Sequence, residues 1–315
     1  MKIISFNEQM ERQVSCVATI GFFDGVHRGH RFLINKVTET AQQTGMASMV
    51  ITFDVHPRHV LCPGWHPQLL STLDEKKELL AQTGVDQLVV LPFNADIAAL
   101  SARSFMEMLR RQGVRVLVTG YDNHFGKRTV DGTEGFDDYV RYGRELDMTV
   151  LACSPFEAGN ILVSSSQVRH FLQIGDVESA ARCLGRSYTL TGNVVRGEHI
   201  GTGLGFPTAN LQLPCADKMV PAAGVYAVRA CIGSSRELLS GMMNIGRRPT
   251  FNGDHLTLEA HVFHFNDNLY GQQMSISFVR RLRSEMKFDS REALAAQLTI
   301  DAQLSKEILN QTNDI

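Results

Sequence analysis

The pattern of hydrophobic residues changes near residue 184, and this change constrains the fold of the chain most. Before that point, short apolar runs rich in β-branched residues alternate with charged segments of helical periodicity. Continuous apolar strands separated by amphipathic helices are typical of a parallel sheet covered on both faces. The runs occupy residues 14–23, 48–54, 87–93, 114–120 and 148–155. Residues 1–183 are therefore predicted to form a doubly wound α/β domain.

Beyond residue 188 the strand-like runs follow one another with Gly, Pro and Asn-Asp turns and with no helical pattern between them. Closely spaced short strands of this kind indicate an antiparallel barrel or sandwich. One helix is predicted at the end of the chain, over residues 289–309, where Asp289 and Glu292 form a D-x-x-E variant of the capping box. Residues 184–315 are therefore predicted to form a second, all-β domain with a C-terminal helix.

Composition excludes several classes of protein. Lys and Arg number 31 and Asp and Glu 33, which gives a net charge of −2, so the chain has no overall electrostatic attraction for nucleic acid. No apolar run approaches the roughly 20 residues of a membrane span or the h-region of a signal peptide. The six cysteines are scattered without a CxxC pair, which favours free thiols in a reducing compartment. A cytoplasmic enzyme or binding protein, without nucleic-acid or membrane partners, is expected.

The first candidate site is the segment GFFDGVHRGH, residues 21–30, where the first strand should end and a helix begin. The carboxyl end of a parallel strand is the usual ligand edge of such a sheet, and a helix N-terminus suits phosphate. His27 and His30 are three residues apart, so they share one face of the first helical turn, from which they could stabilise charge on a phosphate under attack. An incidental pair or a metal pair is the alternative interpretation. A Walker A loop is excluded, because five residues rather than four separate Gly120 from Gly126 and Arg128 replaces Ser or Thr.

The second candidate site combines a glycine-rich loop with a distant carboxylate. Gly197, Gly201, Gly203 and Gly205 could let backbone N–H groups close over an anion. Thr208 and Asn210 alternate by two, so on a strand both point to one face, and their oxygens suit a hard cation such as Mg²⁺.

Downstream, Glu259 and His261 share a strand face that His264 does not, which argues against a three-ligand zinc site in that segment. Glu259 could act as a general base toward an alcohol, although taken alone it could equally be a solvated surface residue.

Together these segments resemble a known family. GFFDGVHRGH resembles the GxFDGxHxGH signature of nucleotidyltransferases, and TFDVHP (52–57), TGYDNHFG (119–126) and VSSSQVR (163–169) resemble later motifs of the FMN adenylyltransferase module of bacterial bifunctional FAD synthetases. GFPTANL, PAAGVYAV, NIGRRPTF, LEAHVFHFNDNLYG and RRLRSEMKFDSREAL resemble the riboflavin kinase module of the same enzymes. The resemblance spans nearly the whole chain. It implies a Rossmann-like nucleotidyltransferase domain followed by a six-stranded Greek-key barrel.

The resemblance also implies roles for individual residues. His27 and His30 would hold ATP phosphates and the transition state, and Glu259 would take the proton from the ribityl hydroxyl. Thr208 and Asn210 would bind Mg²⁺ with ATP. Substrate binding is expected at Phe53, His56 and Asp122. Nucleotide binding is expected at Gly21, Phe22, Phe23, Asp24, Gly29, Asp122, Ser164, Ser165, Arg169, Gly201, Gly203, Gly205, Pro207 and Asn244.

Three positions depart from the family pattern, namely Val55, Asn123 and Thr202. The implied activity is phosphorylation of riboflavin to FMN by ATP, followed by adenylylation of FMN to FAD with release of pyrophosphate. Two alternatives stay open, a nucleotidyltransferase for another small phosphate ester and a flavin-sensing regulator without turnover. The expected partners are small molecules only, and the expected assembly is a monomer or a weak homo-oligomer.

Overall fold

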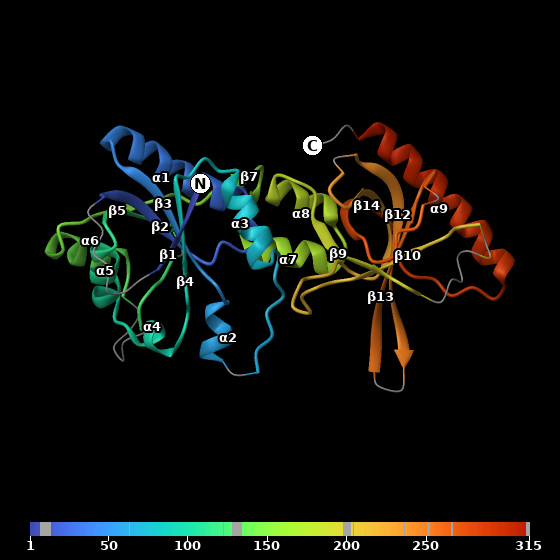
Figure 1. The fold of residues 1–315 in the computed structure, drawn as a ribbon, viewed down its shortest axis with the longest axis horizontal. Coiled ribbons are helices and arrows are strands. Elements are labelled where there is room, and N and C mark those ends of the chain that lie inside the picture. The colour runs from blue at the N-terminus through green and yellow to red at the C-terminus, as the bar shows by residue number, and fades with distance from the viewer. Residues whose placement is uncertain are drawn as a thin grey trace. The chain divides into compact units, whose positions relative to one another are not determined.

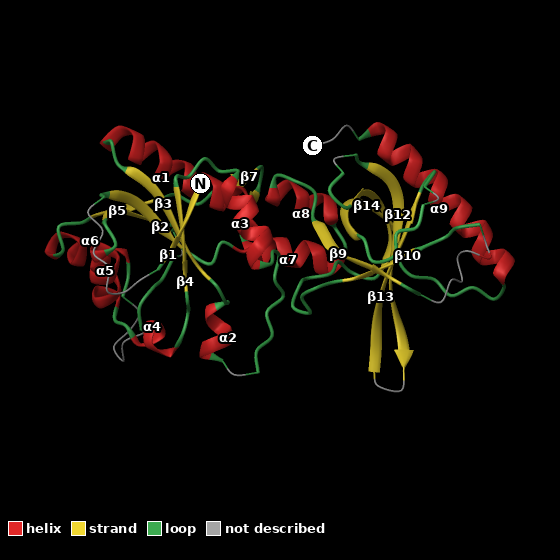
Figure 2. Cartoon of the chain, viewed as in Figure 1, coloured by secondary structure: helices red, strands yellow, loops and turns green. Residues whose placement is uncertain are grey.

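The structure is a computed structural model that describes residues 1–6, 14–62, 64–121, 123–127, 134–197, 203, 205–235, 237–250, 253–265 and 267–312. The chain divides into two compact units, Met1–Ser165 and Ser166–Ile315. The first unit carries helices on both faces of a sheet, and the second carries a barrel (Figures 1 and 2). Each unit is described separately below.

The first unit is built on a six-stranded parallel sheet with the order β1-β4-β3-β2-β5-β6. Its strands are β1 (Lys2–Ser5), β2 (Cys16–Ile20), β3 (Ala47–Phe53), β4 (Gln87–Leu91), β5 (Val114–Thr119) and β6 (Thr149–Ala152). Its helices are the 3₁₀ turn η1 (Asp24–Val26), α1 (Arg28–Thr44), α2 (Pro57–Leu61), α3 (Leu73–Ala81), α4 (Ala95–Ala99), α5 (Ala102–Arg111) and α6 (Phe136–Glu145). A short hairpin, β7 (Glu157–Ala158) with β8 (Ile161–Leu162), completes it.

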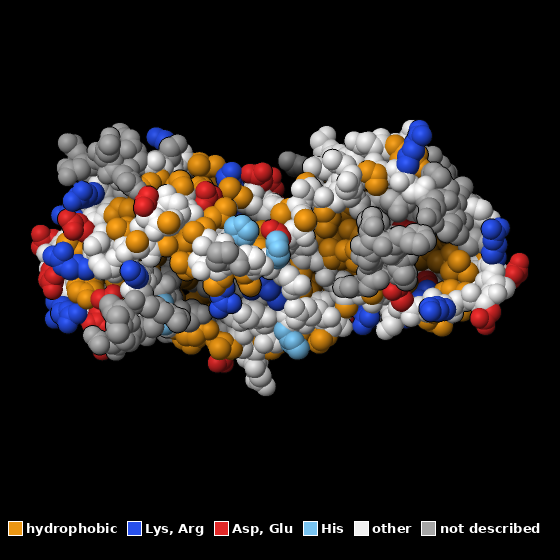
Figure 3. All heavy atoms as spheres, turned by 90° about the horizontal axis from the view of Figure 1, so that it is seen from below, with side chains coloured by type: hydrophobic (Ala, Val, Ile, Leu, Met, Phe, Trp, Pro, Cys, Tyr) orange, Lys and Arg blue, Asp and Glu red, His pale blue; other side chains and the backbone are white. Residues whose placement is uncertain are grey.

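Apolar cores lie on both faces of this sheet, as the continuous apolar runs predict. Successive residues of β2 point to opposite faces, so that Val17 joins the core under α1 and α3, while Ala18 joins the core under α4, α5 and α6. Acidic and basic side chains lie close together on parts of the surface (Figure 3). One such pair joins α5 to α6, where Arg103 lies 2.9 Å from Glu145. The predicted doubly wound α/β domain is confirmed.

The second unit is a closed antiparallel barrel with the order β10-β13-β12-β11-β14-β9. Its strands are β9 (Thr189–Val195), β10 (Ala209–Gln212), β11 (Gly224–Ile232), β12 (Leu239–Thr250), β13 (Gly253–Val262) and β14 (Gln273–Arg283). Its helices are α7 (Ser165–Ile174), α8 (Val177–Leu184) and α9 (Arg291–Gln311). The predicted six-stranded barrel with a C-terminal helix is confirmed.

The C-terminal helix packs against β11, β12 and β14 through a small core that includes Ala302 and Leu309. The cap predicted at Asp289 is wrong by one residue, because the hydroxyl of Ser290 accepts the hydrogen bond from Ala293 N at 3.1 Å and α9 begins at Arg291. Either side chain can cap a helix.

Helices α7, from Ser166 onward, and α8 belong to the barrel unit, although both begin before residue 184. The Glu178 carboxylate of α8 accepts two hydrogen bonds from the Arg280 guanidinium of β14, at 3.0 and 2.8 Å. The limits of the two activities, at residues 183 and 184, stay a prediction.

Candidate active sites

The first site is the turn that joins β2 to α1 at the carboxyl edge of the parallel sheet. The backbone enters the left-handed region at Phe23 (φ 54°), Gly25 (φ 73°) and Val26 (φ 39°). Glycine tolerates this conformation, but a β-branched valine there is strained by roughly 1–3 kcal/mol. Such strain persists only where surrounding contacts hold it, and strained backbone of this kind clusters at functional sites.

The contacts that hold the turn come from the segment before α3. The carboxylate of Asp24, 3% exposed, accepts hydrogen bonds from the backbone N–H groups of Leu70 at 3.0 Å and Ser71 at 3.1 Å. In return, the Ser71 hydroxyl accepts a hydrogen bond from the N–H group of Gly25 at 2.9 Å. Nucleotide binding by Asp24 stays a prediction, and the observed contacts make this carboxylate a support of the turn.

His27 is the N-cap of α1, and its geometry fixes its tautomer. Its Nδ1 accepts a hydrogen bond from the backbone N–H of His30 at 3.2 Å, so the proton of the neutral ring resides on Nε2. The rings of His27 and His30 stack at 3.5 Å between centroids. Burial is the main cause that holds the pKa of His30 well below its ordinary value of 6.5, and its electrostatic interactions with His27 and Lys76 lower it further. The site thus presents a helix N-terminus and imidazole N–H groups, which suit an anion.

Gly29 explains how the two histidines fit together. A Cβ atom at this position would lie 3.2 Å from the ring of His27 and 3.2 Å from the carbonyl oxygen of Val163. A side chain would therefore displace either the imidazole or the backbone that precedes α7. The structure thus gives a steric reason for glycine at position 29, while the predicted contact of Gly29 with nucleotide stays a prediction.

Aromatic side chains gather where β2 and β3 end. The ring of His56 lies 4.6 Å from that of Phe22 and 4.7 Å from that of Trp65, measured between centroids. Phe53 is the last residue of β3 and packs against Phe93. The predicted substrate residues Phe53 and His56 therefore lie on one edge of the sheet with Phe22.

The remaining residues predicted for the first site are distributed as follows. Ser164 directly precedes α7, and the hydroxyl of Ser165, the last residue of the first unit, donates a hydrogen bond to the carbonyl oxygen of Asp24 at 3.1 Å. Arg169 lies on α7 in the second unit. Asn123 donates a hydrogen bond to the carbonyl oxygen of Ile20 at 2.6 Å, which gives this departure from the family pattern a structural role. The predicted residues Asp122 and Gly201, and the departure Thr202, lie outside the described residues.

The second site is a row of side chains across three barrel strands. Glu259 of β13 pairs in register with Asn210 of β10 on one side and with Asn244 of β12 on the other. Directly opposed residues of neighbouring strands place their side chains within reach of one another. The neighbours of Glu259 along β13, Leu258 and Ala260, are buried in the barrel core, so the row lies on the outer face.

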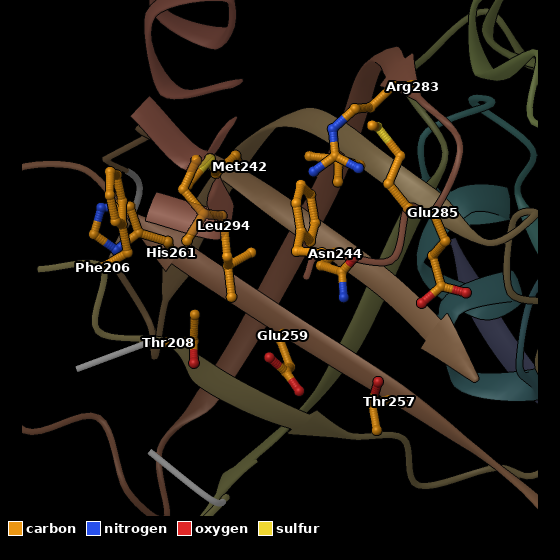
Figure 4. A pocket seen from close by; sticks show the side chains of 14 residues that line it. Phe206, Thr208, Met242, Asn244, Thr257, Glu259, His261, Arg283, Glu285 and Leu294 are labelled. Carbon is orange, nitrogen blue, oxygen red and sulfur yellow. The ribbon is translucent and has the colours of Figure 1, made fainter. Parts of the chain in front are cut away.

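A cavity of about 290 Å³ opens beside this row. Thr208, Thr257 and Glu259 line one side of it, whereas Met242 and Leu294 line another (Figure 4). The predicted residues Thr208, Asn244 and Glu259 are thus brought to one cavity, between the barrel and the start of α9.

The backbone next to Thr208 is held by a histidine. The Nδ1 atom of His261 lies 2.7 Å from the carbonyl oxygen of Pro207, and since a carbonyl only accepts, the imidazole donates. Burial lowers the pKa of His261, which favours this neutral tautomer. Asn210, the second residue of the predicted metal pair, packs against Gly197, where a Cβ atom would collide with the side-chain amide of Asn210. Gly203 and Gly205 are exposed, and Gly205 has a φ of +82° that favours glycine.

Three residues near the sites were not predicted from the sequence. Lys76 of α3 donates hydrogen bonds to the carbonyl oxygens of Phe22 and Phe53, both at 3.0 Å. Arg283 lines the barrel cavity and forms a buried ion pair with Asp301 of α9 at 2.7 Å. No sequence signal singles out these side chains, because each lies in an amphipathic segment with other charged residues.

The fold and the two sites define a class of protein, a two-unit transferase that acts on nucleotide phosphates. Within the part of the chain that the structure describes, no group of three or more His, Cys, Asp or Glu side chains could hold a metal ion. None of the described helices is long and apolar enough to cross a membrane.

Comparison with known proteins identifies the family. Residues 9–167 match the family described as FAD synthetase, and residues 184–309 match the family described as riboflavin kinase. The bifunctional riboflavin kinase/FMN adenylyltransferase of Pseudomonas fluorescens is 36% identical over 93% of both chains, and that of Escherichia coli K12 is 34% identical over 99% of both. The chain belongs to the bifunctional riboflavin kinase/FMN adenylyltransferase family, as its motifs predicted.

A solved structure from Streptococcus pneumoniae, titled a macrolide-efflux protein, has 29% identity and a TM-score of 0.87 over 99% of each chain. The two-unit architecture is therefore shared with an experimentally determined fold over its full length.

Proposed function

We propose that each of the two sites catalyses one of the family's two reactions. As a member of this family, the chain is a riboflavin kinase and an FMN adenylyltransferase. The observation that carries the assignment of sites is that the predicted residues assemble into two separate sets. One set surrounds a helix N-terminus in the first unit, and the other surrounds a cavity in the barrel unit.

In the first site, a phosphate oxygen of FMN attacks the α-phosphorus of ATP, and pyrophosphate leaves. The N-terminus of α1 and the Nε2–H group of His27 point positive ends of dipoles toward the phosphates, where negative charge develops. His30 stays neutral near pH 7, because its pKa is held low, so it acts as a hydrogen-bonding group rather than as a cation. This displacement needs no covalent enzyme intermediate.

In the second site, the terminal ribityl hydroxyl of riboflavin attacks the γ-phosphorus of ATP. Glu259 lies at the wall of the cavity and accepts the hydroxyl proton as general base. The apolar wall that includes Met242 and Leu294 suits the flat, apolar ring system of a flavin, while the polar row suits its hydroxylated chain.

The residues beside Glu259 fit a magnesium ion. The hydroxyl of Thr208 and the amide oxygen of Asn210, on one side of Glu259, are hard oxygen donors of the kind that Mg²⁺ prefers. These two residues would hold the ion, which would neutralise phosphate charge in the bound nucleotide. ATP, riboflavin, FMN and FAD are the substrates and products in this proposal, and Mg²⁺ is the only metal.

Two alternatives predict different products. A nucleotidyltransferase for another phosphate ester would leave riboflavin unchanged, and a flavin-sensing regulator would bind flavin without turnover. The presence of both a carboxylate in the barrel cavity and a histidine pair at the helix N-terminus favours turnover, because a sensor needs no general base.

The test is analysis of the products formed from riboflavin, ATP and Mg²⁺ by three proteins. The unaltered chain should make FAD. A His27→Ala/His30→Ala double variant should accumulate FMN, and Glu259→Gln should ignore riboflavin but convert supplied FMN to FAD. General-base loss costs about 10²–10⁴-fold, which a chromatographic assay resolves. A folded Glu259→Gln protein that cannot adenylylate FMN would refute the separation of the sites.

We also propose that the chain works in the cytoplasm as a monomer or weak homo-oligomer, without nucleic-acid or membrane partners. The activities are proposed to divide at residues 183 and 184. Because α7 and α8 pack with the barrel unit, a kinase fragment that starts at residue 166 should be more stable than one that starts at Leu184. Urea denaturation of the two fragments tests this expectation.

A further inference from the structure

Lys76 is a buried cation that the proposed chemistry does not yet use. It lies on α3, is 2% exposed, and reaches the carboxyl edge of the sheet, where β2 and β3 end. Its Nζ atom donates hydrogen bonds to the carbonyl oxygens of Phe22 and Phe53 at 3.0 Å each, and it lies 4.0 Å from the centroid of the Phe22 ring. A buried charge is costly unless it is paired or performs a task.

Among the residues that the structure describes, Lys76 forms no direct ion pair. Among the described residues, no carboxylate lies within ion-pair distance of its Nζ atom, and the two nearest in electrostatic terms are Asp24 and Asp54. Both carboxylates accept hydrogen bonds from other groups. Asp24 accepts them from the backbone N–H groups of residues 70 and 71, and Asp54 accepts them from the backbone N–H groups of Val55 and Phe93. Asp24 and Asp54 therefore favour the ammonium form of Lys76 from a longer distance, while the direct contacts of its Nζ atom at the sheet edge are the carbonyl oxygens of Phe22 and Phe53.

We infer that Lys76 is the positioning residue of the adenylyl-transfer site, where it holds Phe22 and Phe53 in register and supplies a fixed positive charge behind the nucleotide phosphates. This inference rests on the proposed function of the first site. Phe22 is predicted to contact nucleotide and Phe53 to contact the flavin substrate. One ammonium group therefore holds the backbone of a residue from each predicted binding region. A shift of about 1 Å in such positioning costs up to about 100-fold in rate.

The charge state of Lys76 gives the inference a readout that a merely structural role would lack. Burial lowers the pKa of Lys76 to about 8, against the opposing influence of Asp24 and Asp54 and with a smaller lowering by Lys77. On α1, the positive charge of Lys76 lowers the pKa of His30, and His30 is neutral in this pH range. Above about pH 8 the free enzyme therefore loses the charge, and kcat/KM for ATP in FAD synthesis should fall. Bound phosphates favour the ammonium form, so the corresponding fall in kcat should occur at higher pH.

The experiment compares Lys76→Met, Lys76→Arg and the matched control Lys77→Met in the full chain. Lys77 is the next residue of α3, is partly exposed and pairs with Asp74 at 3.0 Å on the surface. Lys76→Met should lower kcat/KM for FAD synthesis about 100-fold and leave riboflavin phosphorylation unchanged, because that reaction belongs to the other unit. Lys77→Met should leave both activities within about twofold. Lys76→Arg should move the alkaline fall in kcat/KM above pH 10, since guanidinium stays charged.

The kinase activity and the fluorescence of Trp65 report whether each variant is folded, since Trp65 is the only tryptophan and lies in the first unit. If Lys76→Met does not fold, the pH profile of the unaltered enzyme decides: a kcat/KM for FAD synthesis that stays flat from pH 7 to 9.5 would overturn the inference. So would a folded Lys76→Met protein with more than a third of the normal rate. An unaltered chain that makes no FAD from FMN would instead refute the proposed function.

Discussion

Replacing Asp301 by alanine is expected to destabilise the barrel unit selectively. Asp301 is 1% exposed on α9, and its two carboxylate oxygens accept three hydrogen bonds from the guanidinium of Arg283, at 2.7, 3.0 and 3.1 Å. The side-chain amide of Gln297 donates a further bond at 3.0 Å. Arg283 ends β14 and lines the barrel cavity, so this ion pair joins α9 to the barrel beside the cavity.

The loss in the free energy of unfolding depends on the guanidinium charge of Arg283, which remains when Asp301 is removed. Removal of one member of a buried ion pair costs about 3–5 kcal/mol, because the partner is left buried and uncompensated. The side chain of Arg283 is 17% exposed and regains some hydration, so the lower end of the range, about 3 kcal/mol, is expected. With a urea m-value of about 2 kcal/mol/M, the midpoint of unfolding should fall by about 1.5 M.

Two probes separate the units in this measurement. Far-UV circular dichroism follows the unfolding of both units, whereas the fluorescence of Trp65 follows only the first. Asp301→Ala should lower the barrel transition and leave the Trp65 transition in place. The control is Glu178→Ala, which removes an ion pair with Arg280 whose side chains are each 49% exposed. That pair should contribute only about 0–1 kcal/mol. An equal shift for both variants would refute the reasoning from burial.

Thr208→Ala should slow riboflavin phosphorylation at least about 100-fold and leave FMN adenylylation within about twofold, because it removes an oxygen donor from one site only. EDTA should stop both reactions and Mg²⁺ should restore them; stoichiometric zinc in the purified protein would contradict this expectation. The first unit should lose stability as pH falls below 6.5, because unfolded His30 takes up a proton that the folded site disfavours. Its urea midpoint, followed by Trp65 fluorescence, should therefore be lower at pH 5.5 than at pH 7.5. His261→Phe should lower kcat/KM for the kinase reaction about 10–100-fold by releasing Pro207, and His261→Gln, which keeps a donor, should restore part of the loss.

The two folds could be predicted because their strands differ in pattern. A parallel strand buried on both faces is apolar throughout, as in β2 and β3, whereas the barrel strand β13 alternates between core and cavity. The edge strand β1 was not predicted, because four residues at a sheet edge carry too little pattern. Helices α7 and α8 belong to the barrel unit because of their tertiary contacts, and these contacts cannot be predicted from the hydrophobic periodicity of the sequence.

The sites were predicted only as far as their motifs extend. Thr208, Asn244 and Glu259, which the motifs single out, line one cavity in the structure, and their roles stay predictions. Lys76 and Lys77 are indistinguishable in the sequence, and only the position of α3 over the sheet edge buries one and exposes the other. Long-range contacts of this kind decide which charged residue of an amphipathic helix acts at a site.

Both sites share a physical requirement that explains where their unpredicted residues lie. Functional turns have irregular backbone, and their partly buried carbonyl groups need donors that a helix or sheet would otherwise supply. In the first site Lys76 donates a hydrogen bond to the carbonyl oxygen of Phe22, and in the barrel His261 donates one to the carbonyl oxygen of Pro207. Each donor comes from an element other than the motif segment whose backbone it contacts. A motif therefore identifies the side chains that face substrate, whereas the residues that hold its backbone must be found from the buried donors of the folded chain.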